Sequence, residues 1–565
     1  MAFQLSPSVN VTEIDASGIV PAVATSIGGF VGTFQWGPVE QITTISNEAD
    51  LVRVFAKPND TVAQSFFSAA NFLAYANNLK TVRVVGAAAK NAVASGTAIL
   101  IKNSTDWEGT YVENGVLLGN SGATGEWAAK YAGVLGNSLK VSMVDSASWS
   151  SWTYKNNFDA APATSDFCKA LGATTAHDEL HIVVVDEDGL FTGTPGTVLE
   201  RFAFLSKAEN AKKSDGTRSY YAEVISKNSK YIWWMDHTAS VESGAHDAWG
   251  SKATATSNFK ITTGIVTKSL AGGVDDDAPD SNAFITAWGV FENSETVDVN
   301  LLITGPASTE VCQAVLALAE TRKDCVVFVS PQLSSVYADS VVDDRQNLNI
   351  NSSYAIMDSG WKYQYDKYND KYRWVPLNAD TAGLCARTDD IADPWFSPAG
   401  LNRGQIKNVV KLNWNPGTQA DRDTLYQSQV NPVVTMAGQG TVLMGDKTML
   451  TRPSAFDRIN VRRLFIVLEK AIATAGKFQL FEFNDAFTRA QFRNLVEPFL
   501  RDVQGRRGVY DFKVVCDATN NTAEVIDSNG FVADIFIKPA RSINFMQLNF
   551  IATRTGVSFT EVAGA

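Results

Sequence analysis

The chain has 565 residues, which is enough for three or four domains, because domains usually hold about 100–200 residues. Hydrophobic residues make up 45% of it and charged residues only 19%, a composition that supplies several packed cores and argues against disorder. The formal net charge of −12 argues against a general nucleic-acid binder, which would normally be basic.

The first twenty residues predict one short strand on a tether, with Pro7 before it and Gly18 after it. The uncharged stretch 16–39 is interrupted by prolines and glycines and follows Glu13 and Asp15, so it fits neither a spanning helix nor a signal peptide. We interpret it as a linker into a buried strand over 26–36 and expect a soluble protein without membrane insertion.

Two amphipathic helices are predicted next, over 47–55 and 60–77, and a strand follows over 81–85. Strand–helix–strand order is typical of an α/β domain. Residues 87–130 are rich in Ala, Gly, Asn, Ser and Thr and predict a small inserted, protruding subdomain.

Regular patterning returns with predicted strands over 139–144, 181–185 and 231–234. The sequence therefore predicts an outer domain made of residues 21–86 and 131–268, with a β-rich outward insertion.

A middle α/β domain is predicted over 269–430. It contains helices over 280–291 and 308–323 and apolar strands over 297–304 and 325–329. Two apolar strands joined by a helix indicate a βαβ unit with parallel pairing.

The last block, 431–565, is predicted to form an inner C-terminal domain that ends in an arm over 542–565. Its expected helices cover 457–475 and 486–501, and its expected strands cover 510–516, 531–537, 542–552 and 557–562. The predicted fold class is therefore multidomain α/β and α+β.

Possible catalytic or metal motifs are weak. His177 and His181 lie four residues apart, but strand-like residues follow, and on a strand such side chains stand about 13 Å apart, too far to share one metal. The segment 440–448 approaches a phosphate-binding loop, but Asp446 occupies the place of its lysine, which favours a hairpin.

Neither a cluster of aspartates nor the cysteines predict a metal site. The acids Asp275, Asp276, Asp277 and Asp280 miss the spacing of a calcium loop and suit the start of a helix. Five cysteines at wide spacing fit neither a disulfide framework nor a zinc site, and we expect them to fill cores. The sequence thus predicts neither an enzyme nor a cofactor.

Positive charge gathers in one block of this acidic chain. Residues 451–513 hold twelve Arg or Lys against seven Asp or Glu. For a single arginine a solvated helix face is the simpler interpretation, whereas the cluster predicts a docking surface for an acidic partner. The candidate docking residues are Arg458, Arg462, Arg463, Arg489 and Arg493.

Both ends of the chain are strongly strand-forming, although chain ends are usually polar and frayed. They either pack onto their own domain, pair with each other, or add to the sheets of neighbouring subunits. For the third arrangement the exchanged residues are Val9, Val11, Ile543, Phe545, Leu548, Phe550, Val557 and Phe559.

Several segments in order resemble the tail sheath proteins of contractile-tailed bacteriophages. They include residues 32–38, 363–369, 373–377, 382–387, 397–404, 456–465 and 538–556. The resemblance is dense over 26–85 and from about Leu270 onward, and it is faint between Ala87 and Lys268.

This resemblance implies a structural subunit in the virion tail, assembled in the host cytoplasm. It would polymerise as stacked hexameric rings around an inner tail tube and contract to drive the tube through the host envelope. Expected partners are other copies of the chain, the tube protein, and baseplate and tail terminator proteins, without direct nucleic-acid binding. The family's usual Ser-Pro-Gly-Val turn reads Ser-Pro-Ser-Val at Ser6–Val9, which leaves the path of the N-terminal arm open.

Two alternatives remain at this stage. One is the sheath of a bacterial contractile injection device. The other is a hydrolase or nucleotidase that uses His177 and His181 or the segment 440–448.

Overall fold

A computed structural model describes residues 23–113, 124–241, 249–544 and 546–547. The chain divides into two compact units. We call Val23–Pro394 with Pro398–Lys470 the sheet unit, and Trp395–Ser397 with the described residues from Ala471 onward the terminal unit.

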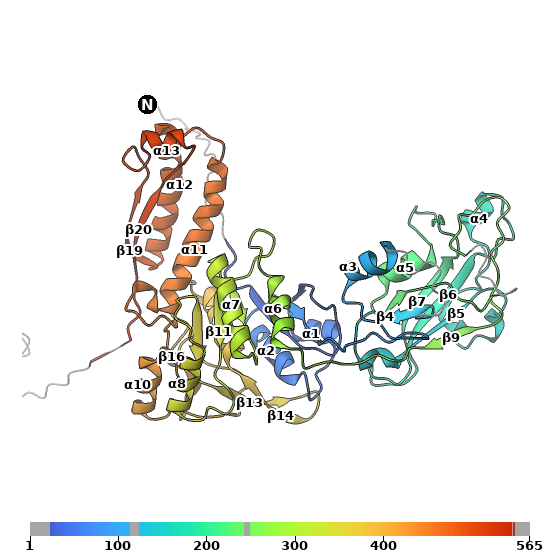
Figure 1. Cartoon of the computed structure of the whole chain (residues 1–565), viewed down its shortest axis with the longest axis horizontal. Helices are drawn as coiled ribbons and strands as arrows, with labels where there is room; N and C mark the ends of the chain where they lie inside the picture. The colour runs from blue at the N-terminus through green and yellow to red at the C-terminus, as the bar shows by residue number, and fades with distance from the viewer. Residues whose placement is uncertain (1–22, 114–123, 242–248, 545, 548–565) are drawn as a thin grey trace, which may run out of the picture. The chain divides into compact units, whose positions relative to one another are not determined.

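The sheet unit is built on a seven-stranded sheet (Figure 1). All neighbouring strands are parallel except the edge strand β2, which runs antiparallel to β3. The strand order is β16 (Val430–Asn431), β12 (Ala355–Asp358), β11 (Val326–Val329), β10 (Leu301–Ile303), β1 (Gly28–Gly32), β3 (Leu79–Arg83) and β2 (Thr43–Ile45).

Helices cover both faces of this sheet, so its strands are apolar on both sides. Phe30 and Val31 of β1 are both buried, but they enter different cores because successive side chains of a strand point to opposite faces. Phe30 packs with α1 (Glu48–Phe55), α2 (Ala63–Leu73) and α9 (Asn378–Ile391). Val31 packs with α6 (Ser281–Gly289), α7 (Thr309–Arg322), α8 (Ala338–Asn347) and α10 (Gln419–Gln427).

Residues 87–274 form a β-rich region with its own core. An antiparallel sheet has the order β7 (Thr197–Ser206), β6 (Glu179–Asp186), β5 (Leu139–Val144) and β9 (Val266–Ser269). A smaller antiparallel pair joins β4 (Trp127–Ala129) to β8 (Ile232–Trp234), and α5 (Tyr221–Asn228) packs beside β8.

Two small antiparallel sheets complete the sheet unit. One has the order β14 (Lys371–Pro376), β13 (Trp361–Asp366) and β15 (Lys411–Leu412), and the other pairs β17 (Val433–Met436) with β18 (Gly440–Leu443).

The terminal unit combines helices with one antiparallel strand pair. The helix α11 (Ile459–Gly476) ends in it, and α12 (Ala486–Gly505) follows. The pair β19 (Val509–Val515) and β20 (Asp534–Pro539) packs on α12, with α13 (Ala523–Asp527) between the strands in sequence. Phe492, Val496 and Leu500, four residues apart, form the buried stripe of α12.

The predicted domain boundaries need three corrections. Residues 21–86 do not join 131–268, because β1 and β3 belong to the sheet that contains β10. Residues 87–130 are not a separate subdomain, because Val93 and Trp127 share a core with β5 and β6. The C-terminal unit begins at Ala471 rather than at 431, because β16 completes the large sheet.

Candidate assembly surfaces

The β19–β20 pair exposes sheet edges and aromatic side chains. Within the described residues it has only two strands, and Tyr510 and Phe536 are 66% and 59% exposed. An isolated two-stranded sheet is marginally stable, and its outer edges carry unpaired N–H and C=O groups. This pair therefore has room for further strands.

The chain that leaves β20 carries the first residue of the predicted exchange set. Ile543 follows β20 in irregular structure and is 82% exposed. Among the described residues this large aliphatic side chain covers no core. The remaining predicted exchange residues lie outside the described residues: Val9, Val11, Phe545, Leu548, Phe550, Val557 and Phe559.

The turn between α11 and α12 forms a second apolar surface, which the sequence analysis missed. Phe478, Phe481 and Phe483 in this turn are largely exposed, as is Phe487 in the first turn of α12. Their alternation with polar residues over 477–484 is the signal that was available. Exposed apolar groups gathered in one loop mark an interaction surface.

Arg463 is buried inside the sheet unit and has three partners there. It donates to Asp389 Oδ2 at 2.6 Å and to the carbonyls of Cys385 and Thr25 at 3.2 Å. The Thr25 hydroxyl also donates to Asp389 Oδ2, at 2.6 Å. The docking prediction for Arg463 is wrong in this structure, because its charge is neutralised within the chain.

Arg462 is also buried and corrects the prediction in the same way. Its guanidinium lies 4.1 Å from the Phe456 ring centre and 4.3 Å from that of Tyr354, and it donates to the Tyr354 hydroxyl. Burial lowers its pKa. This side chain stabilises the packing of α11 and is not on the surface.

The other three arginines are partly exposed. Arg458 precedes α11 rather than lying on it; it donates to the Tyr426 hydroxyl at 2.8 Å and lies 3.8 Å from Asp446. Arg489 donates to the Asn484 side chain at 3.1 Å, and Arg493 lies 3.9 Å from Glu497. The structure does not bring the five arginines together into one exposed cluster.

His181 has a structural role. Its Nδ1 accepts from the Phe204 amide at 3.0 Å, so Nε2 carries the proton and donates to the Ala160 carbonyl at 2.9 Å. Its ring is stacked on Phe158, and burial lowers its pKa. Among the described residues no group of His, Cys, Asp or Glu is arranged to hold a metal ion.

The phosphate-loop candidate is a hairpin, as predicted, because Val433–Met436 pairs antiparallel with Gly440–Leu443. Lys447 donates to the Tyr426 carbonyl at 2.7 Å. Its ammonium is therefore engaged within the chain.

The acidic group over 275–280 serves separate local contacts. Asp280 caps α6, as expected of an acid at a helix start, whereas Asp275 and Asp276 accept from the amides of Val134 and Ala88. The five cysteines are buried, as predicted. In the part of the chain that the structure describes, no helix is long and apolar enough to span a bilayer.

The described residues combine a multidomain α/β fold with open strand edges, which are features that a structural assembly subunit needs. Comparison with known protein families identifies which kind of assembly subunit the chain resembles. Three family models match: the phage tail sheath protein central domain over residues 278–449, the phage tail sheath C-terminal domain over 451–553, and the domain III N-terminal region of tail sheath protein Gp18 over 25–84.

Curated relatives match along the whole chain. The tail sheath protein of Enterobacteria phage T4 is 36% identical over 99% of both chains, and that of Salmonella phage ViI is 34% identical over 99% of this chain and 98% of its own. The sheath tail protein Lin1278 from Listeria innocua has the same fold, with a TM-score of 0.55 at 12% identity over 92% of this chain and 93% of its own. The chain belongs to the phage tail sheath protein family.

Proposed function

We propose that this chain polymerises as stacked rings around an inner tail tube, and that the polymer contracts to drive the tube through the host envelope. Membership of the tail sheath family supports self-assembly in the virion tail. The curated relatives are phage proteins, which favours a phage tail over a bacterial injection device.

The observation that carries the proposed linkage is the two-stranded β19–β20 sheet. In our proposal, residues 1–20 and 542–565 of neighbouring copies add strands to its open edges. Each main-chain hydrogen bond contributes about 0.5–1.5 kcal/mol net, so a few of them per joint hold subunits together. Rigid units then rotate about these joints while the links persist.

Buried contacts at the start of the sheet unit support the same mechanism. Thr25 lies just after the N-terminal arm and is bonded to both Arg463 and Asp389. A strand that is pulled by a neighbour would therefore transmit force directly into the core beside α9 and α11.

Partners beyond the chain itself follow from the family. We propose baseplate and terminator proteins at the two ends of the polymer and a tube protein inside it. For the tube contact we retain Arg489 and Arg493 on α12, because both side chains are partly exposed.

Deletion of residues 1–16 or 553–565 tests the mechanism. Each deletion should leave a monomer with the unfolding temperature of the full chain, because neither segment belongs to a described core, and it should abolish tubes in negative-stain micrographs. Normal tubes from either deletion would refute strand exchange.

A further inference from the structure

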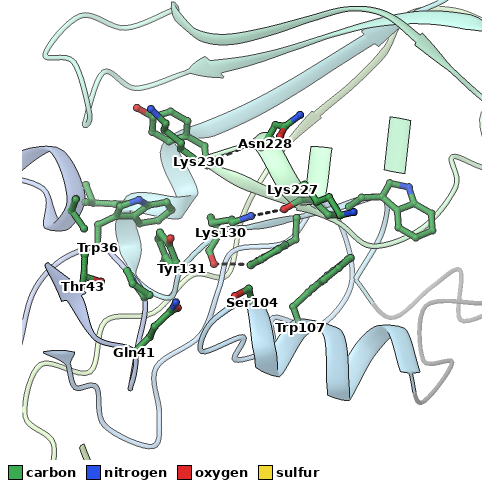
Figure 2. A pocket seen from close by; sticks show the side chains of 18 of the residues that line it. Trp36, Gln41, Thr43, Ser104, Trp107, Lys130, Tyr131, Lys227, Asn228 and Lys230 are labelled. Carbon is green, nitrogen blue, oxygen red and sulfur yellow. Dashed lines mark hydrogen bonds between the residues drawn. The ribbon is translucent and has the colours of Figure 1, made fainter. Parts of the chain in front are cut away.

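The sheet unit contains a large cavity. Its volume is about 1730 Å³, and its wall is formed by residues 35–57 and by the β-rich region (Figure 2). A drug-sized ligand typically occupies about 300–1,000 Å³. The space therefore suits a chain of several linked rings rather than a single small ion.

Aromatic rings line this cavity on two sides. Trp36 contacts both Tyr131 and Phe191 edge to face, with ring centres 5.3 and 5.1 Å apart, and Phe191 contacts Tyr231 in the same way. Trp107 is stacked on Trp233 at 5.0 Å. Trp36 and Trp233 are buried, whereas Trp107, Tyr131, Phe191 and Tyr231 are partly exposed. These four rings, held in place by aromatic neighbours, offer rigid apolar surface to a ligand.

Two buried polar atoms beside the cavity have no hydrogen-bond partner among the described residues. Ser226 is buried, and its hydroxyl has no hydrogen-bond partner among the described residues; the same holds for Trp107 Nε1. Lys130 is buried with its ammonium 3.2 Å from the Trp233 ring centre, and it donates to the Ser226 carbonyl at 2.8 Å. An ammonium has three N–H donors, so this bond leaves donors for a ligand.

Charge in the lining is opposite to that of the whole chain. The lining contains six basic and three acidic side chains, although the chain has a net charge of −12. Lys227 and Lys230 are exposed at the rim, and Figure 2 shows Lys130 between the Trp36–Tyr131 side and Trp107. Burial lowers the pKa of Lys130 to about 7, because it disfavours the charged ammonium. A bound carboxylate would stabilise that charge.

We propose that this cavity binds an acidic oligosaccharide, such as a chain of uronic or sialic acids. Sugar rings present apolar C–H faces to aromatic platforms and hydroxyl edges to amides such as those of Gln41 and Asn228, which both donate and accept. The carboxylates meet Lys130, Lys227 and Lys230. The site would give the sheath an affinity for acidic glycan, in addition to its part in the proposed contraction.

Titration of the full-length chain by calorimetry and tryptophan fluorescence tests the proposal. The probes are hexasaccharides of mannuronate, galacturonate and α2,8-linked sialic acid, with maltohexaose as the neutral comparison. We expect saturable one-to-one binding of at least one acidic probe, at least tenfold tighter than maltohexaose.

Variants locate the site. Lys230→Gln and Tyr231→Ala should each weaken binding tenfold or more, whereas the matched Tyr372→Ala, at an exposed tyrosine on β14, should leave it unchanged. If Tyr231→Ala does not fold, Lys227→Gln replaces it at the surface.

Three results would overturn the proposal. One is the absence of saturable binding for every acidic probe, and the second is equal or tighter binding of maltohexaose. The third is binding that both pocket variants leave unchanged. Loss of tube assembly in those variants, with no glycan binding by the parent chain, would assign the cavity to a second copy of the chain.

Discussion

Asp358, at the end of β12, is a buried acid whose proton affects stability. Its carboxylate accepts from the Ser330 hydroxyl at 2.7 Å and from the Gly360 amide at 3.0 Å. Burial raises its pKa to about 8, against about 3.9 in an unfolded chain. Between these values the folded state binds the proton more tightly than the unfolded state does.

Asp358→Asn should remove part of the pH dependence of stability. Because the native state holds the extra proton, stability falls as pH rises from about 4 to 8, by up to about 1.4 kcal/mol per pH unit for this group. In a monomer that lacks residues 1–16, the free energy of unfolding should therefore decline less steeply with pH when Asp358→Asn is added. Identical slopes in parent and variant would show that Asp358 is ionised in the folded protein.

Arg463 shows why the arginine site could not be predicted from sequence. The basic block is visible in composition. However, Arg463 is bonded to Thr25 and Asp389, which are both distant from it in sequence. The sequence around an arginine on an apolar helix does not show whether its guanidinium contacts solvent or a buried carboxylate. Only the fold decides between these environments.

Arg463→Met should destabilise the monomer by about 3–5 kcal/mol, because it leaves Asp389 buried without its cation. Adding Asp389→Leu should recover part of that loss, since no uncompensated charge remains. Chemical denaturation measures both, and Arg501→Met, at an exposed arginine, is the control, with an expected change within about 0.5 kcal/mol. A loss no larger than that of the control would contradict the buried role.

At the scale of elements, local pattern predicted helices and strands well. The strand expected over 139–144 is β5, and the helix expected over 308–323 is α7, capped by Ser308 and buried through Val311 and Val315. Capping and periodicity are local signals. Domain membership failed because β1 pairs with β10, more than 270 residues away, and no local signal encodes that pairing.

The face of α12 that carries Arg489 and Arg493 is the element on which we propose tube docking. Arg493→Glu should weaken co-sedimentation with purified inner-tube protein and reduce its dependence on salt, because a screened attraction is removed. Lys155→Glu, at an exposed lysine of the β-rich region, is the control for the same reversal of charge. Equal effects of the two variants would remove the docking assignment.

At the scale of the molecule, we propose that neighbouring copies complete the subunit, because the terminal unit has a strand pair with open edges. The sheet unit buries its seven strands on both faces, so it is suited to move as a rigid body. The terminal unit instead presents β19, β20 and Ile543 to the outside. Contraction, in this account, changes the positions of rigid units while the shared sheets persist.

A cryo-EM reconstruction of tubes assembled from the full chain tests this account most directly. It should show each β19–β20 pair extended by strands from residues 1–20 and 542–565 of neighbouring copies. Tubes in which both ends of every chain return to their own subunit, with no sheet shared between copies, would contradict it.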